Sequence, residues 1–254
     1  MTKEQLKIYL DSKVEKFNQL EFIESDPIQI PHKFTKKEDI EIAGFLAATI
    51  AWGNRKMIIR NSNRMVDYMD NAPYDFVVNH QESDLEKLNG FVHRTFNDQD
   101  FKQFIKSLKN IYLQHGGIEE VFTKYQGESD MKEAIFQFRE HFFEIDHLQR
   151  THRHVSNPLK GSAAKRINMY LRWMVRNDNK GVDFGLWKGV PMSKLSIPLD
   201  VHSGRIGREL GMLHRKQNDW KAVAELDEQL RLLDPNDPVK YDYALFGIGV
   251  FDDR

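Results

Sequence analysis

Hydrophobic residues recur at three- and four-residue spacing along most of this chain, and that spacing predicts helices. The first such segment, residues 2–18, is amphipathic, with charged residues between its apolar positions. The next, residues 38–52, is apolar nearly all round after Ile42, which is typical of a helix that is buried on every side. The chain therefore starts with a surface helix and continues into a core helix.

The same periodicity predicts further helices downstream. They cover residues 55–70, 74–79, 82–88, 100–114, 118–125, 130–145, 165–176, 217–233 and 239–250, with one more after Asp200. Alternation with a period of two residues never extends beyond about four residues, so neither strands nor hairpins are expected. The pattern predicts an all-α protein of about ten to twelve helices.

Polar residues before several of these segments predict helix caps. Thr35 and Glu38 have the spacing of a capping box. Asp98 is placed to cap the helix that follows it. Asp237 is placed to cap the last helix, with Pro238 at its first position.

The segment 130–145 is rich in phenylalanine, and two interpretations stay open for it. The simpler interpretation is a packed hydrophobic core, and the more specific one is a surface on which nucleic-acid bases stack. Three histidines follow at positions 147, 152 and 154. A His-x-His pair can bind zinc, but no carboxylate stands at ligand spacing, so we expect surface histidines and no metal site.

Composition narrows the class of protein. The 254 residues include 40% hydrophobic and 11% aromatic side chains, enough for a sizeable core. There is no Cys, which excludes disulfides, cysteine-ligated iron–sulfur clusters and thiolate zinc sites. No apolar run reaches the length of a membrane span, and the charged amphipathic N-terminus is unlike a signal peptide. We therefore expect a cytoplasmic protein without a membrane partner.

Charge is balanced overall but unevenly distributed. The formal net charge is −1, yet residues 150–180 hold eight Lys or Arg and a single acid, Asp178. A basic stripe on a nearly neutral protein favours a phosphate-bearing partner. The alternative is a solvated helix face on which basic residues cluster by chance.

Residues 158–211 contain the candidate chemistry. Gly161 marks a turn, and a helix begins a few residues later with Lys165 and Arg166. Backbone N–H groups at such a helix start, together with the helix dipole, favour a phosphate. Lys165 is a candidate nucleophile there, or it merely binds phosphate or solvent. Asp200 heads the next helix, where an aspartate is most often an N-cap.

These residues resemble the helix-hairpin-helix DNA glycosylase superfamily. Leu159, Gly161 and Lys165 match its hairpin, of the type LPGVGxK, and the segment after Pro198 resembles its motif of the type VDTHVxRVxxRLG. The long intervening loop is similar to the archaeal 8-oxoguanine glycosylase branch. The phrases AKRINMYLRWMVR, GVDFGLW and DPVKYDYALFGIGV resemble a bacterial family of uncharacterised proteins, domain of unknown function 2400, over nearly the whole chain.

The resemblance implies a single helical domain, residues 1–254, with a helix-hairpin-helix glycosylase-like fold. Its two helical subdomains would be residues 38–150 and residues 1–37 with 151–254, with the active-site cleft between them. The implied partner is double-stranded DNA with a damaged base or an abasic site, bound by a monomer without a cofactor.

The implied reaction is excision of a flipped-out, damaged base, an oxidised purine such as 8-oxoguanine, followed by strand cleavage. Lys165 would attack the sugar and form a Schiff base, with Asp200 assisting. The residues implied to contact DNA are Lys160, Gly161, Ser162, Ala163, Arg166, His202 and Arg205.

Two positions depart from the family pattern. Ala163 replaces the second hairpin glycine, and Val201 replaces the threonine of the second motif. An alanine is harmless where φ is negative but can block close approach of the backbone to phosphate. We expect the departure at Ala163 to bear on DNA affinity more than on the chemistry.

A base pocket is the further implication of the resemblance. Trp52 and Asn54 end the buried helix where relatives place residues that probe the duplex, and Asp242 and Phe246 share one face of the last helix. Three of these residues have a plainer alternative: Trp52 as a core tryptophan, Asp242 as a surface acid and Phe246 as a core aromatic. Two other functions also stay open, a helix-hairpin-helix protein that binds DNA without catalysis and a helical interaction protein unrelated to DNA.

Overall fold

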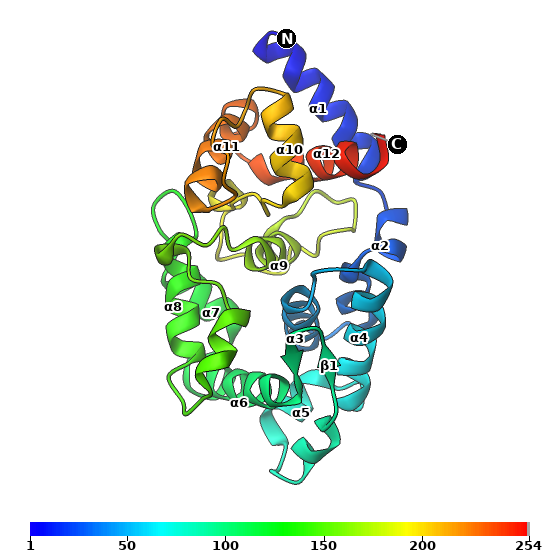
Figure 1. The fold of residues 1–254 in the computed structure, drawn as a ribbon, viewed down its shortest axis with the longest axis vertical. Coiled ribbons are helices and arrows are strands. Elements are labelled where there is room, and N and C mark those ends of the chain that lie inside the picture. The colour runs from blue at the N-terminus through cyan, green and yellow to red at the C-terminus, as the bar shows by residue number, and fades with distance from the viewer. Residues whose placement is uncertain (253–254) are drawn as a thin grey trace. The chain divides into compact units, whose positions relative to one another are not determined.

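The computed structural model describes residues 1–252, and these residues are predominantly helical (Figure 1). The α-helices are α1 Lys3–Phe17, α2 Glu21–Ser25, α3 Lys37–Thr49, α4 Arg55–Tyr68, α5 Pro73–Asn79, α6 Asp98–Gln114, α7 Ile118–Lys124, α8 Lys132–Phe142, α9 Lys165–Val175, α10 Val201–Glu209, α11 Trp220–Leu233 and α12 Tyr241–Gly247. The only strands in the described residues are β1 Val92–His93 and β2 Phe96–Asn97, which pair antiparallel. The prediction of a helical protein is confirmed, whereas the expectation of neither strands nor hairpins is wrong at this one short hairpin, whose two-residue strands are too short to show an alternating pattern.

Contacts between residues divide the chain into two compact units. Unit 1 consists of residues 1–23, Gln126–Glu133 and the chain from Asn157 onward. Unit 2 consists of Glu24–Tyr125 and Ala134–Ser156. Each unit is therefore built from segments that are far apart in sequence.

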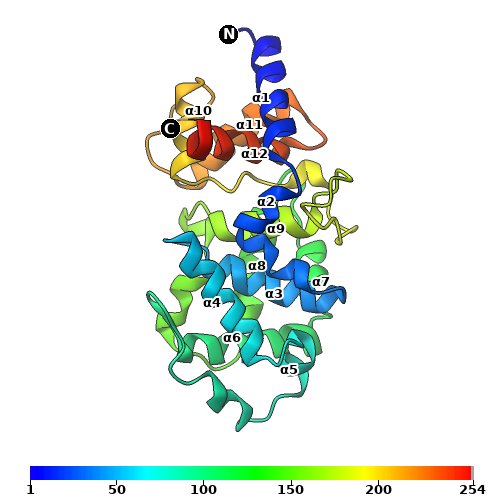
Figure 2. The same cartoon turned by 90° about the vertical axis from the view of Figure 1, so that its right-hand side faces the viewer.

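Unit 1 has an aliphatic core that joins both ends of the chain. Helix α1 packs against α12, and α12 also packs against α10; the ribbon shows these helices side by side from two directions (Figures 1 and 2). Leu10 from α1, Ile206 from α10 and Leu226 from α11 are buried in the same cluster. The amphipathic pattern of the first helix thus serves to close this core.

Helix α9 is buried on nearly every side, since all its residues from Ile167 to Val175 are buried. The loop that follows folds back over it. The N–H of Phe184 donates to the carbonyl oxygen of Trp173 at 2.8 Å, and the N–H of Trp187 donates to that of Met174 at 3.0 Å. The long loop between α9 and α10 is therefore part of the packed structure around α9.

Unit 2 has an aromatic core. The ring of Phe45, on α3, lies 5.7 Å from that of Phe104 and 5.3 Å from that of Phe138, centroid to centroid. The rings of Phe104 and Phe142 are 4.7 Å apart. Such edge-to-face and offset pairs add stability beyond burial of their area. These contacts confirm the first interpretation of the phenylalanine-rich segment, that it is part of a packed core. Helix α3 is buried as predicted.

The predicted caps give mixed outcomes. Asn97 caps α6 in place of Asp98, and α3 has no side-chain cap, so the capping box at Thr35 is wrong. Asp237 makes no cap hydrogen bond, because its carboxylate instead accepts from Arg176. Asp200 does cap its helix. At Asp237 the outcome is decided by a competing side-chain partner, which sequence spacing does not reveal.

No helix among residues 1–252 combines the length and the apolar character that a transmembrane segment requires.

Asp227 illustrates a buried charge in unit 1. It lies on α11 with 2% exposure, accepts the N–H of Ile197 at 2.9 Å, and has Arg231 at 3.7 Å. Burial raises the pKa of the Asp227 carboxyl to about 6, against the opposing effect of Arg231. The folded state therefore binds this proton more tightly than the unfolded state.

We expect Asp227→Asn to remove a pH-dependent loss of stability. Because the folded-state pKa is raised, the wild type loses stability as pH rises from about 4 to about 6, by up to roughly 3 kcal/mol. The variant should lack this loss, as measured by urea-induced unfolding at pH 4.5 and 7.5. Glu228→Gln, an exposed change on the same helix, is the control. Equal pH dependence in Asp227→Asn and wild type would contradict the expectation.

Candidate functional site

The turn before α9 is held by its own backbone and side chains. A 3₁₀ turn at Pro158–Lys160 begins with Asn157, whose side chain accepts the N–H of Lys160 at 3.1 Å. Gly161 ends the turn with φ of 90°, a conformation that favours glycine. A Cβ at Gly161 would meet no atom within 4 Å, so the glycine is required by its backbone angle and not by crowding.

Ala163 fits the turn without strain. Its φ is not positive, whereas the next residue, Ala164, is left-handed with φ of 49°. The position that would favour glycine is therefore Ala164, and the alanine at 163 carries no conformational cost. Its carbonyl oxygen accepts a hydrogen bond from Asn168 at 3.2 Å, and its side chain packs against the unit 1 core.

Lys165 is the first residue of α9, and its side chain is partly exposed. Ala164 at the N-cap offers no side-chain hydrogen bond, so N–H groups of the first turn lack the usual cap. Among residues 1–252, no hydrogen bond or ion pair is made by the Lys165 ammonium group. This amine is thus open to a ligand.

Asp200 is held rigidly at the start of α10. Its Oδ1 accepts the N–H of Ser203 at 2.9 Å, and its own N–H donates to Ser203 Oγ at 2.9 Å. The amide of Asn218 donates to the Asp200 carbonyl oxygen at 2.9 Å. The predicted N-cap is correct, and Oδ1 is the carboxylate atom that makes it.

Asp242 connects Lys165 and Asp200 electrostatically. It lies on α12 with 7% exposure and pairs with Arg172. Burial raises the pKa of its carboxyl to about 6; Arg172 and Lys165 act to lower this pKa, and Asp200 acts to raise it. Coulomb interactions weaken with separation and are screened over about 10 Å at 0.1 M salt. Lys165 and Asp200 thus each act electrostatically on Asp242, whose direct partner is Arg172 of α9.

A network of buried charges lies behind this carboxylate. Arg172 donates to Asp183 Oδ1 at 3.2 Å, and Arg176 donates to Asp183 Oδ2 at 3.0 Å. Arg176 also pairs with Asp237 at 3.0 Å. The guanidinium of Arg172 lies over the Tyr243 ring, 4.4 Å from its centroid.

These roles of Arg172 and Asp183 were not predicted from the sequence. The available sign was spacing, since Arg172 stands seven residues after Lys165, which is two turns along the same helix face.

The basic stripe predicted over residues 150–180 is not one surface. Arg172 and Arg176 are buried in the network, with side chains 4% and 2% exposed. Arg150 pairs with Asp100 at 3.3 Å and Lys180 with Glu15 at 2.6 Å. A count of charges along the sequence cannot separate such pairs from free cations, and this prediction of a stripe is wrong.

The residues implied to contact DNA divide into two groups within unit 1. Lys160, Gly161 and Ser162 are exposed at the turn. The other group is attached to the end of the chain: His202 Nδ1 lies 3.2 Å from the carbonyl oxygen of Gly249, and Arg205 donates to the same oxygen at 3.2 Å.

Arg166 and Phe246 are also in unit 1, on the same helices as Lys165 and Asp242. Burial lowers the pKa of Arg166 to about 10, so this side chain stays charged at neutral pH. Phe246 lies one helical turn after Asp242 on α12, and its ring meets that of His202 edge to face at 6.1 Å. The two proposed pocket residues of α12 are thus close to the capping region of α10.

Trp52 and Asn54 belong to unit 2. Asn54 caps α4 by accepting the N–H of Met57 at 3.1 Å, which gives it a structural role. The half-buried Trp52 ring packs edge-on against His93 at 5.1 Å and stacks on His154 at 6.1 Å. The tryptophan is therefore fixed between two histidines.

The predicted surface histidines are partly buried instead. His154 is 4% exposed, and its Nε2 lies 3.3 Å from Asp100 Oδ2. His147 and His152 face one another, with 2.6 Å between their Nε2 atoms. The carboxylate partner of His154 is far away in the sequence, which is why spacing did not reveal it.

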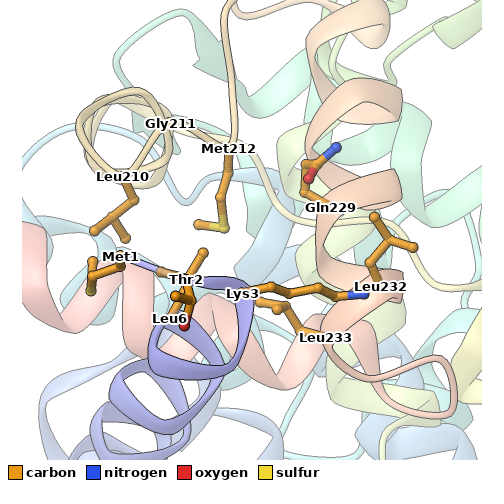
Figure 3. Close-up of a pocket in the computed structure, with 10 residues that line it drawn as sticks. All are labelled: Met1, Thr2, Lys3, Leu6, Leu210, Gly211, Met212, Gln229, Leu232 and Leu233. Carbon is orange, nitrogen blue, oxygen red and sulfur yellow. The ribbon is translucent and has the colours of Figure 1, made fainter.

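A pocket of about 240 Å³ lies elsewhere in unit 1 (Figure 3). Apolar and polar groups share its lining: Leu6, Leu210, Met212 and Leu233 are among the apolar side chains, and Thr2, Lys3 and Gln229 are among the polar ones. None of the predicted site residues lines this pocket, and it offers no acid–base pair.

Comparison with known families places most of the chain in one of them. The sequence model described as protein of unknown function (DUF2400) matches residues 26–251, so the chain belongs to that family. No curated protein and no solved structure gives a match.

Arg172→Ala should strongly destabilise unit 1, because Asp183 and Asp242 would each lose the ion pair that they form with Arg172. Breaking a buried ion pair from one side typically costs about 3–5 kcal/mol. Lys7→Ala, which removes an exposed ion pair with Asp11 at 2.6 Å, should cost within about 1 kcal/mol. Urea-induced unfolding at neutral pH measures both. Similar costs for the two variants would show that the buried network contributes little.

Proposed function

We propose that this member of the DUF2400 family is a DNA glycosylase with abasic-site lyase activity. The observation that carries the proposal is the packing of three elements in unit 1. Helix α9, which Lys165 begins, is joined by the Arg172–Asp242 ion pair to α12, and α12 packs against α10, which Asp200 caps. An amine and two carboxylates on elements that contact one another are the groups required to attack a sugar carbon and to move the resulting protons.

In the proposed reaction the neutral amine of Lys165 attacks C1′ of a nucleotide that has been flipped out of the duplex. The base leaves with the electron pair of the glycosidic bond and takes up a proton. The nitrogen that is now bound to C1′ loses a proton. The C1′–O4′ bond then breaks, which opens the sugar ring, and O4′ takes up a proton. A Schiff base between C1′ and Lys165 results.

Strand cleavage follows from the Schiff base. Loss of the C2′ proton and departure of the 3′ phosphate break the strand by β-elimination. Water then hydrolyses the imine and restores the lysine amine. No cofactor is needed, since each step transfers only protons and electron pairs between groups already present.

The two carboxylates are suited to different parts of this sequence. Asp200 is fixed by its cap, so its negative charge is preorganised to stabilise positive charge on the sugar. Asp242 has a pKa of about 6, closer to neutrality than an ordinary carboxyl and therefore better matched to accept and return a proton.

The turn before α9 supports a contact with the DNA backbone. Lys160, Gly161 and Ser162 are exposed there, next to the uncapped start of α9. N–H groups at the start of a helix favour a phosphate oxygen. The absence of strain at Ala163 favours this role, because the alanine does not distort the turn.

The substrate is proposed from the resemblance to the archaeal branch: double-stranded DNA carrying an oxidised purine such as 8-oxoguanine. Phe246 and Asp242 are proposed to line the base pocket, with Trp52 and Asn54 acting on the duplex. Stacking of a base on an aromatic ring contributes roughly 1–3 kcal/mol.

Lys165→Ala should abolish covalent trapping. Borohydride reduces the Schiff base to a stable amine, so wild-type protein incubated with DNA that carries an abasic site, or 8-oxoguanine opposite cytosine, should give a covalent adduct on a denaturing gel. Lys188→Ala, an exposed lysine of the same unit, should trap as wild type does.

Two outcomes would overturn the assignment of Lys165. An adduct that persists in Lys165→Ala identifies another amine. Salt-dependent DNA binding without adduct or cleavage in the wild type leaves a helix-hairpin-helix protein that only binds DNA.

Asp242→Asn should change the pH dependence of abasic-site cleavage. If Asp242 accepts a proton, the wild-type rate falls as pH drops through about 6, the pKa of this carboxyl. An amide does not titrate, so the variant should lose rate at neutral pH and show no inflection near that pH. Single-turnover cleavage rates between pH 5 and 8 measure this. An unchanged inflection would exclude Asp242 as the titrating group.

A further inference from the structure

Two histidines and a glutamate converge in unit 2, and none of them is among the candidate site residues of unit 1. His115 ends α6, His141 lies in the last turn of α8, and Glu144 follows that helix. One ligand atom from each lies within 4.8 Å of the others. Unlike the histidine pairs considered from the sequence, this group has a carboxylate.

The geometry within the group is convergent. His115 Nε2 lies 2.6 Å from Glu144 Oε1, and His141 Nδ1 lies 3.2 Å from Glu144 Oε2. The two imidazole rings are 4.2 Å apart, centroid to centroid. Both rings thus direct a nitrogen at the same carboxylate, which is the arrangement of donors around a small cation.

Neighbouring residues orient the donors. His141 Nε2 lies 3.3 Å from the hydroxyl group of Tyr125, and Asn110 donates to Glu144 Oε1. Such outer contacts fix the ring orientation and the tautomer of a ligating histidine. Hydrogen bonds from the histidines to Glu144 are the alternative explanation of the cluster, and the experiment below separates the two.

We propose that His115, His141 and Glu144 form a binding site for a divalent transition-metal ion, with zinc the best match. Two imidazoles and one carboxylate are a common zinc ligand set, which leaves a fourth position for water. Imidazole also suits copper, nickel and cobalt, whereas magnesium and calcium require more oxygen ligands than this site offers.

The site is accessible and links two helices. The side chains of His115, His141 and Glu144 are 22%, 21% and 37% exposed, so an ion can enter from solvent. Because the ligands come from the end of α6 and the end of α8, a bound ion would hold these helices together. The metal would therefore stabilise unit 2, and the site takes no part in the lysine chemistry proposed for unit 1.

Calorimetric titration of the metal-free full chain with zinc chloride tests the proposal. We expect one tight equivalent of zinc and a higher Tm with zinc than without it. Cobalt chloride should give the visible absorption of a four-coordinate ion. His115→Ala and Glu144→Gln should each weaken binding at least about tenfold, since loss of a ligand or of its support typically costs that much.

His152→Ala is the matched control, because His147 and His152 are the other histidine pair with facing nitrogens. It should retain the tight equivalent. Circular dichroism of each variant checks the fold, and Glu144→Gln changes an exposed side chain, so its effect on binding is separable from unfolding. Zinc binding that is absent, unchanged in His115→Ala and Glu144→Gln, or lost in His152→Ala would overturn the assignment.

Discussion

Burial of two arginines on α9 is the constraint on which the rest of unit 1 depends. A guanidinium group taken out of water must be paired, because the desolvation cost of an unpaired charge amounts to several kcal/mol. Arg172 meets Asp183 and Asp242, and Arg176 meets Asp183 and Asp237. The carboxylates come from the loop after α9, from α12 and from the turn before it. All of these segments must therefore be in place before either arginine is satisfied.

The candidate site follows from this network. Lys165 begins the helix that carries both arginines, and Asp242 is held by one of them on α12. Helix α10, capped by Asp200, packs against α12. The three polar groups are thus attached to elements that the buried charges and the aliphatic core already fix. Preorganisation of this kind allows charge on a substrate to be stabilised without moving the protein.

The two units place polar residues differently. In unit 1 most of the buried charge is in direct ion pairs between arginine and aspartate. In unit 2 histidines lie beside two carboxylates, the buried Asp100 and the exposed Glu144. Imidazole titrates near neutrality and binds metals, whereas guanidinium does neither. The metal site proposed for unit 2 uses imidazole ligands, whereas the chemistry proposed for unit 1 uses a lysine and two aspartates, so the two proposals are independent.

The sequence by itself determined the helical class, the buried α3, the aromatic core and the cap at Asp200. Each of these rests on local spacing or on one side chain and its neighbouring backbone. Tertiary structure alone decided which charges are free. Arg172 and Arg176 belong to a run of basic residues, yet their partners stand up to seventy residues away. Asp98 and Asp237 do not cap the predicted helices for a related reason, since their carboxylates accept from Gly90 and from Arg176. Long-range pairing sets the energy of a buried charge, and local sequence does not record it.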